Sequence, residues 1–196
     1  MTSFRVASQW LDYFNDQCNF ISHLNQSVIQ ALTVRLYPHD YGWDQATRWS
    51  DRFPTLQLDD GRSLFATLIR KSRLLIGTMN GTTYLESIIL NVPTVIFWNP
   101  QHSELRASAI PYFEDLKRVG IFHEGPKSAA QHVNTIWDNV NAWWETPELQ
   151  AVLQRFTTRY CFQPKDLLDR VEAALRETIA EHATGRQSDS GGRQGG

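Results

Sequence analysis

A run of small and polar residues in the middle of the chain has the composition of a phosphate-binding turn. The run GTMNGTT (77–83) follows the apolar segment SRLLI (72–76) and precedes a helical pattern. A helix N-terminus offers unpaired backbone N–H groups and the positive end of the helix dipole, which suit a phosphate or diphosphate. Asn80, Thr82 and Thr83 add polar side chains, and Glu86, one turn into the helix, suits sugar hydroxyls. Thr83-x-x-Glu86 is also a capping box that needs no ligand, and its spacing alone favours the cap.

One arginine interrupts the first of the short apolar runs. Arg35 lies inside TVRLYP (33–38), and a guanidinium in a buried strand needs a carboxylate or an anionic ligand to offset its desolvation. Asp59 and Asp60 follow the next run, PTLQL (54–58), and are the candidate carboxylates. An ion pair within the chain and contact with a ligand are equally consistent with this pattern.

Neither the histidines nor the cysteines have metal-ligand spacing. His39, Asp40 and Asp44 follow residues 33–38, and ordinary loop residues are the favoured interpretation of this group. Nothing near Cys18 or Cys161 in the sequence suggests an activated thiolate, so we expect them to act as small hydrophobic residues. We therefore predict no metal site and no bound cofactor.

A histidine and a glutamate follow the apolar run PTVIFW (93–98). His102 and Glu104 suit an acid–base pair, but a helix capped by Ser103 with Glu104 in its first turn explains them equally well. The sequence lacks the G-x-x-x-x-G-K-[ST], G-x-S-x-G, H-E-x-x-H and G-x-G-x-x-G patterns. These absences argue against P-loop NTPases, the usual α/β-hydrolases and classical NAD enzymes.

The elements that must position these residues alternate between strands and helices. The runs at 72–78 and 93–98 are apolar without alternation, which is typical of strands covered on both faces of a parallel sheet. Helical patterns are expected at 5–30, 62–72, 83–90 and 105–119, and after Pro126, Pro147 and Pro164. Within 105–119, Pro111 is expected to open a second helical piece. Trp137, Trp143 and Trp144 have the spacing of residues that pack into a core. Strands separated by helices indicate βαβ units. The predicted fold is α/β, with a Rossmann-like parallel sheet flanked by helices.

Composition narrows the class of protein. The chain has 196 residues and a net charge of −2, which argues against nonspecific nucleic-acid binding because that needs a basic field. No apolar run approaches the ~20 residues that span a bilayer, and the N-terminus lacks the pattern of a signal peptide. Two cysteines without a disulfide framework indicate a reducing cytoplasm. We expect one folded domain over residues 1–183 and a glycine-rich disordered tail over 184–196.

Four segments carry a resemblance to a known family. They are VRLYPHDYGWDQATRWSDRFP (34–54), SRLLIGTMNGTTYLES (72–87), NVPTVIFWNPQHSELRASAIPYFEDLKRVGIFH (91–123) and IWDNVNAWW (136–144). From about Gln9 to Cys161, the chain resembles the C-terminal portion of bacterial surface-carbohydrate transferases of the lipopolysaccharide or capsule type. That family is in turn similar to the nucleotide-sugar-binding half of GT-B glycosyltransferases.

The resemblance implies the C-terminal half of a GT-B-type fold, with additional C-terminal helices, that binds a nucleotide-activated sugar. The sugar would be transferred to a carbohydrate acceptor, and the nucleotide sugar would be a substrate rather than a cofactor. By position, Thr82 and Thr83 would face the diphosphate and Glu86 the ribose hydroxyls. The other residues expected to line the same crevice are Arg35, His39, Asp59, His102 and Glu104.

Full-length relatives carry an N-terminal domain as well, and the cleft between the two domains holds the acceptor. In inverting GT-B enzymes the catalytic base commonly comes from that domain, so no catalytic residue is predicted here. The chain begins near the end of what would be the first strand of the C-terminal domain. This implies that the N-terminal domain is a separately encoded partner or that the chain is a truncated product. We expect the chain to be located in the cytoplasm or peripherally at the inner membrane face. The alternative interpretation is a noncatalytic interaction domain or an inactive fragment of such a transferase.

Overall fold

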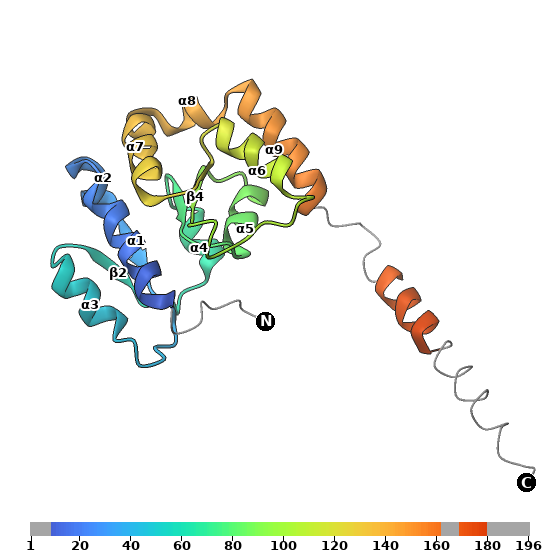
Figure 1. Cartoon of the computed structure of the whole chain (residues 1–196), viewed down its shortest axis with the longest axis horizontal. Helices are drawn as coiled ribbons and strands as arrows, with labels where there is room; N and C mark the ends of the chain where they lie inside the picture. Colours follow the sequence, from blue (N-terminus) through green and yellow to red (C-terminus); the bar gives the residue numbers. More distant parts are fainter. Residues whose placement is uncertain (1–8, 162–168, 180–196) are drawn as a thin grey trace, which may run out of the picture. The chain divides into compact units, whose positions relative to one another are not determined.

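A computed structural model of the chain describes residues 9–161 and 169–179 (Figure 1). The chain divides into two compact units, Met1–Cys161 and Phe162–Gly196, and all the candidate site residues belong to the first. In the second unit, residues 169–179 form a helix with exposed side chains. The helix start predicted at Pro164, the tail predicted at 184–196 and the strand end predicted near Met1 lie outside the described residues.

Helices alternate with short strands throughout the first unit. The strands are β1 (Thr33–Arg35), β2 (Gln57–Asp59), β3 (Leu75–Gly77), β4 (Thr94–Phe97) and β5 (Phe122–His123). The helices are α1 (Trp10–Ser22), α2 (Gln26–Ala31), α3 (Gln45–Arg52), α4 (Phe65–Ile69), α5 (Thr83–Ile89), α6 (Ile110–Arg118), α7 (Pro126–Ile136), the 3₁₀-helix η2 (Trp137–Asn139), α8 (Val140–Trp144) and α9 (Pro147–Tyr160). The helical pattern at 5–30 is thus two helices within the described residues.

All strand pairs in the described residues are parallel, which confirms the predicted α/β class. β1 pairs with β2, with Arg35 opposite Asp59, while β3, β4 and β5 form a second sheet in that order. The sequence predicts one sheet, and the described chain instead forms a two-stranded and a three-stranded sheet. Strands of two to four residues make ladders with few hydrogen bonds, so the continuity of a single sheet is weakly enforced.

Strand β4 is buried along its whole length and separates two apolar clusters. Val95 and Phe97 face the cluster formed with α1 and α7, while Ile96 and the following Trp98 face the cluster formed with α5, α6 and α9. Successive side chains of a strand point to opposite faces, so one apolar run supplies both clusters. Figure 1 shows α1 and α7 on one side of β4 and α5, α6 and α9 on the other. The prediction of a strand covered on both faces is confirmed.

The tryptophans of the later helices pack as predicted. Trp144 is buried, and Trp137 and Trp143 are partly buried against the core. The indole N–H of Trp143 donates to the carbonyl of Val119 at 3.0 Å, and that of Trp144 donates to Asn91 Oδ1 at 2.9 Å. These indoles therefore fill core volume while their polar edges are satisfied.

The helix predicted over 62–72 is only five residues long. It is α4, which begins at Phe65, because Arg35 Nη2 donates to the carbonyl of Ser63 at 2.6 Å and holds the preceding turn. Within this helix Ile69 is buried, whereas Leu64, which precedes it, is 78% exposed. A tertiary hydrogen bond therefore overrides the local helical pattern.

Helices that follow proline begin close to the predicted positions. Pro111 lies in the first turn of α6, where its missing N–H has no intrahelical acceptor to lose. The preceding residues, 105–109, are not helical, so the two-piece helix expected over 105–119 is a single helix. Thr146 is the N-cap residue of α9, but its hydroxyl donates to the carbonyl of Trp143 instead of capping the helix.

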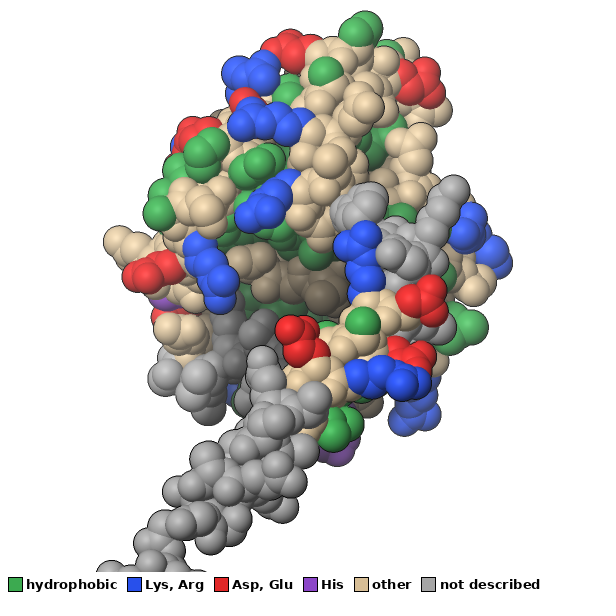
Figure 2. Space-filling view, turned by 90° about the vertical axis from the view of Figure 1, so that its right-hand side faces the viewer, with side chains coloured by type: hydrophobic (Ala, Val, Ile, Leu, Met, Phe, Trp, Pro, Cys, Tyr) green, Lys and Arg blue, Asp and Glu red, His purple; other side chains and the backbone are tan. Residues whose placement is uncertain are grey.

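Charged side chains of both signs share the surface. On the face shown in Figure 2, Lys and Arg are interspersed with Asp and Glu. Asp115 on α6 pairs with Arg155 on α9, and Arg118 pairs with Glu148, so ion pairs join these two helices. Exposed pairs of this kind contribute little, and the helices are held mainly by their apolar faces. Within the described residues, no helix combines the length and the apolar composition needed to cross a membrane.

Two glycines with positive φ provide a matched test of close packing. Gly61 has φ +77°, and a Cβ there would lie 2.4 Å from the carbonyl oxygen of Leu36, whereas Gly42 has φ +85° and open space around it. We expect Gly61→Ala to lower the free energy of unfolding by about 2–4 kcal/mol and Gly42→Ala by about 1 kcal/mol. Urea denaturation measures both variants. Equal losses would mean that backbone conformation alone, and not the contact with Leu36, requires glycine at position 61.

Candidate functional site

The carboxyl edge of the three-stranded sheet carries two of the predicted groups. Because β3 and β4 are parallel, with Gly77 opposite Ile96, the segments that follow these strands leave the sheet at the same edge. Asn80, Thr82, Thr83 and Glu86 follow β3, and His102 and Glu104 follow β4. Ligands of open parallel sheets bind at this edge, so the topology supports grouping these residues.

The turn between β3 and α5 is anchored on both sides. The hydroxyl groups of Tyr13 on α1 and Thr78 are 2.8 Å apart, and the Tyr84 hydroxyl donates to Asn80 Oδ1 at 3.4 Å. Burial is the main cause of the raised pKa of Tyr84, so its hydroxyl stays protonated at neutral pH. The turn is therefore fixed by a helix that precedes the sheet and by the helix that follows it.

The first turn of α5 has no side-chain cap. Thr82 is the N-cap residue and makes no capping hydrogen bond through its hydroxyl. The predicted Thr83-x-x-Glu86 capping box is therefore wrong, because the helix begins one residue earlier than that pattern requires. Thr82, Thr83 and Glu86 are all exposed. Their hydroxyl and carboxylate groups lie beside backbone N–H groups that have no intrahelical partner.

Helix α5 is tied to the sheet by a buried polar contact. The hydroxyls of Ser87 and Thr94 are 2.8 Å apart, and both side chains are buried. Each hydroxyl also lies 2.8 Å from a carbonyl oxygen, Ser87 from that of Tyr84 and Thr94 from that of Val92, so one hydroxyl donates to its carbonyl while the other donates across the pair. Because a buried hydroxyl must be hydrogen-bonded, this contact fixes the position of α5 on β4.

The segment after β4 is a loop and not a helix. Asn99 Oδ1 accepts from the backbone N–H of Gln101 at 3.0 Å, and the N–H of His102 donates to the carbonyl of Asn99 at 2.9 Å. The alternative in which Ser103 caps a helix is wrong, because the next helix starts only at Ile110. His102 is half-buried and Glu104 is exposed.

Arg35 and Asp59 form an ion pair on the two-stranded sheet. Nη1 of Arg35 lies 3.0 Å from Asp59 Oδ1 and 3.1 Å from Ser63 Oγ, and Nη2 donates to the carbonyls of Gly61 and Ser63 at 2.7 and 2.6 Å. Asp59 also accepts from the N–H of Gly61 at 2.7 Å. The ion-pair alternative is therefore the one observed, and it holds together the turn that follows β2.

His39 lies in the exposed loop that follows β1. Its ring contacts Tyr41 edge to face, with centroids 4.6 Å apart. The predicted residues thus fall into three local groups: the β3–α5 turn, the loop after β4, and the two-stranded sheet with its loop. Only the first two share a sheet.

A pair of histidines that the sequence did not single out lies at β5 and α7. The rings of His123 and His132 are 5.3 Å apart, and the imidazole of His132 lies where a Cβ on Gly120 would come within 2.5 Å. Burial, and secondarily the neighbouring His123, lowers the pKa of His132 to about 4. Burial also lowers the pKa of His123. Eight residues separate the two histidines in sequence, and that spacing carries no recognised signal.

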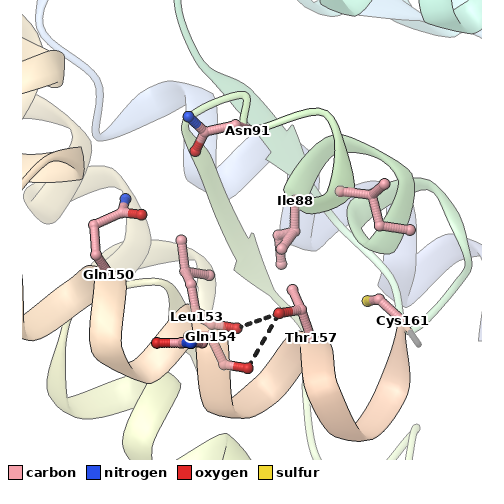
Figure 3. A pocket seen from close by; sticks show the side chains of 8 residues that line it. Ile88, Asn91, Gln150, Leu153, Gln154, Thr157 and Cys161 are labelled. Carbon is pink, nitrogen blue, oxygen red and sulfur yellow. Dashed lines mark hydrogen bonds between the residues drawn. The ribbon is translucent and has the colours of Figure 1, made fainter. Parts of the chain in front are cut away.

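A cavity of about 400 Å³ lies between α5 and α9 (Figure 3). It is lined by Ile88, Ile89, Asn91, Gln150, Leu153, Gln154, Thr157 and Cys161, none of which was predicted as a site residue. Gln150 donates to the carbonyl of Trp144 at 2.7 Å, and Thr157 donates to that of Leu153 at 2.9 Å. Since these polar groups already have partners, the cavity has the character of a packing gap between helices.

The cysteines and the acidic residues do not form a reactive centre. Burial raises the pKa of both Cys18 and Cys161, so neither thiol is activated, as predicted. In the part of the chain that the structure describes, no three His, Cys, Asp or Glu side chains come together as a metal site would require. The chemistry available at the sheet edge is therefore that of backbone N–H groups, hydroxyls, single carboxylates and the imidazole of His102.

Parallel strands separated by helices, with polar loops at the carboxyl edge of the sheet, define an α/β protein. Residues 1–175 match the sequence model described as LIC12162 family transferase, and the chain belongs to this family of transferases. No curated protein and no solved structure matches the chain. The predicted transferase class is confirmed by the family.

The ion pair of Arg35 yields a stability prediction with an adjacent control. Arg35→Ala removes four hydrogen bonds and leaves the half-buried Asp59 without its cation, so we expect a loss of about 1–3 kcal/mol in the free energy of unfolding. Arg62→Ala removes only the exposed pair with Asp60, 3.7 Å long, and should cost less than about 0.5 kcal/mol. Urea titrations compare the two. A loss below about 0.5 kcal/mol in the free energy of unfolding of both variants would mean that Arg35 does not stabilise the fold.

The low pKa of His132 predicts a pH dependence of stability. The ordinary pKa of histidine is 6.5, so between pH 6.5 and about 4 the unfolded chain binds more protons at this position than the folded chain. This contribution to stability is complete above pH 6.5 and declines as the pH falls toward 4. Thermal unfolding of His132→Gln should show a flatter pH profile in that range, whereas His39→Gln should keep the original slope. An unchanged profile in His132→Gln would contradict the assignment.

Proposed function

We propose that this chain supplies the donor site of a glycosyltransferase for bacterial surface polysaccharide and binds a nucleotide-activated sugar at the carboxyl edge of the three-stranded sheet. The observation that carries the proposal is the uncapped start of α5, with Thr82, Thr83 and Glu86 exposed directly after a parallel strand. Membership of a transferase family supports it.

Each group at this edge suits one part of a nucleotide sugar. Backbone N–H groups at the start of α5 would hold the diphosphate, and the hydroxyls of Thr82 and Thr83 would add donors. Glu86 accepts hydrogen bonds only when ionised, so it suits the ribose hydroxyls and not the phosphates. His102 and Glu104, which follow the neighbouring strand, would face the transferred sugar.

The site requires little reorganisation on binding. The turn is held by Tyr13 and Tyr84, and α5 is held on β4 by the contact between Ser87 and Thr94. A site positioned in advance loses less conformational entropy when the ligand binds. Arg35 contributes less to this proposal, because its hydrogen-bond donors are directed at Asp59, Gly61 and Ser63.

Calorimetric titration of the full chain with UDP-, GDP- and CMP-linked sugars tests the proposal. We expect one nucleotide class to bind and Glu86→Ala to weaken that binding about tenfold, the loss of one charge-assisted hydrogen bond. Glu86 is exposed, so the variant should keep the original melting temperature. Glu145→Ala, at an exposed glutamate that ends α8, is the matched control and should bind normally. Failure of all three nucleotide classes to bind, together with a silent Glu86→Ala, would exclude this donor site.

A further inference from the structure

Aromatic rings recur at every second position in the loop that follows β1. Tyr37, His39, Tyr41 and Trp43 make up this aromatic platform, and Tyr41 lies at its centre. The Tyr41 ring stacks with Tyr37 at 5.8 Å and contacts His39 at 4.6 Å and Trp43 at 5.5 Å between centroids. Tyr41 is nevertheless 55% exposed. The platform therefore presents a supported aromatic surface to solvent.

Ring contacts connect the platform to the core. Trp43 stacks on Trp10 with centroids 5.3 Å apart, and Trp10 stacks on Phe14 at 5.4 Å. Arg48 supports the stacking of Trp43 on Trp10. Its guanidinium lies 5.5 Å from the centroid of the Trp10 ring, and its Nε donates to the carbonyl of Trp43 at 2.8 Å. An exposed ring that is continuous with buried rings keeps its orientation when a ligand arrives.

The backbone of the loop is held by one carboxylate. Asp40 accepts from the N–H groups of Trp43 at 2.7 Å, Asp44 at 3.2 Å and Gln45 at 3.1 Å. Desolvation opposes ionisation of Asp40, but these backbone donors outweigh it and lower its pKa. The loop therefore keeps its shape without a ligand across the neutral pH range.

A buried donor beneath the platform lacks an acceptor among the described residues. Gln45 is 9% exposed, and its Oε1 accepts from the N–H of Tyr37 at 3.4 Å, which places the amide directly against the platform. Its Nε2 is buried and makes no hydrogen bond within the described chain. A buried amide that lacks a partner is costly, and a hydroxyl or a water oxygen would satisfy it.

The charge around the platform selects the class of ligand. Residues 36–47 contain Asp40 and Asp44 and no lysine or arginine, and the guanidinium of Arg48, which comes next, is directed at the carbonyl of Trp43 and the ring of Trp10. A phosphate group on the platform would therefore meet mainly negative charge. An uncharged sugar ring fits better, because its C–H groups carry partial positive charge toward the negative face of an aromatic ring and its hydroxyls can donate to carboxylates.

We infer that the aromatic platform binds the pyranose ring of an uncharged carbohydrate, stacked on Tyr41. Its identity as the acceptor of the transfer rests on the proposed function, whereas carbohydrate binding itself does not. The platform differs in chemistry from the β3–α5 turn: it offers aromatic faces and carboxylates where the turn offers N–H groups and hydroxyls. Donor and acceptor sugars would therefore be recognised by different loops.

Saturation-transfer NMR of the full chain with tetrasaccharides of glucose, N-acetylglucosamine and galactose tests the inference. We expect at least one to bind with millimolar affinity, and Tyr41→Ala to weaken that binding about tenfold. Tyr41→Phe keeps the ring and should retain most of the affinity. Leu64→Ala, at an apolar residue that is 78% exposed in the loop after β2, is the matched control and should bind normally.

Three results would overturn the inference: no tetrasaccharide binds at about 10 mM, Tyr41→Ala binds as well as the original chain, or only choline or uridine monophosphate, run as parallel probes, requires Tyr41. The nucleotide-sugar titration is repeated on Tyr41→Ala to separate the two proposals. Saccharide binding that depends on Tyr41 without nucleotide-sugar binding supports the platform and contradicts the donor site. The reverse result supports the donor site and overturns the platform.

Discussion

The burial of β4 on both faces is the constraint on which the rest of the first unit depends. A strand that is buried at every residue must be covered by helices on two sides and paired along both edges. Val95 and Phe97 organise one cluster and Ile96 the other, and burying a side chain of this size contributes about 1.5–3 kcal/mol. Parallel neighbours on both edges then bring the segments after β3 and β4 to one side of the sheet. The candidate donor site follows from this requirement.

Charged and titratable groups inside the unit are either paired or neutral. Arg35 directs its guanidinium at Asp59 and the turn after β2, and the imidazole of His132 is kept neutral at neutral pH by burial. Groups that have been committed in this way are poorly suited to meet a ligand. The side chains of Thr82, Thr83 and Glu86 are exposed and carry no such structural role. The candidate site thus differs in burial from the residues that stabilise the fold around it.

Two loops at strand ends differ in their chemistry although the same fold produces both. The turn after β3 leads into the start of a helix, so backbone N–H groups and hydroxyls dominate it. The loop after β1 is longer, and Asp40 closes it onto its own backbone, which leaves aromatic rings at its surface. The proposed glycosyl transfer would bring together a charged donor and an uncharged acceptor, and this division of chemistry matches that proposal.

The sequence alone determined the positions of the strands, the helices that begin near Pro111, Pro126 and Pro147, and the packing of the late tryptophans, because burial periodicity and proline geometry are local properties. It also identified Asp59 and Asp60 as candidate carboxylates for Arg35, but contact with a ligand was equally consistent with the pattern, and only the structure decided for the ion pair with Asp59. Only the tertiary structure decided that the strands divide into two sheets, that the helix at 62–72 shrinks to Phe65–Ile69, that α5 begins without its predicted cap, and that His123 meets His132. Each of these depends on which distant segment arrives as a partner. Local patterns show that a residue must be buried, paired or capped, whereas only the packed chain determines which distant residue is its partner.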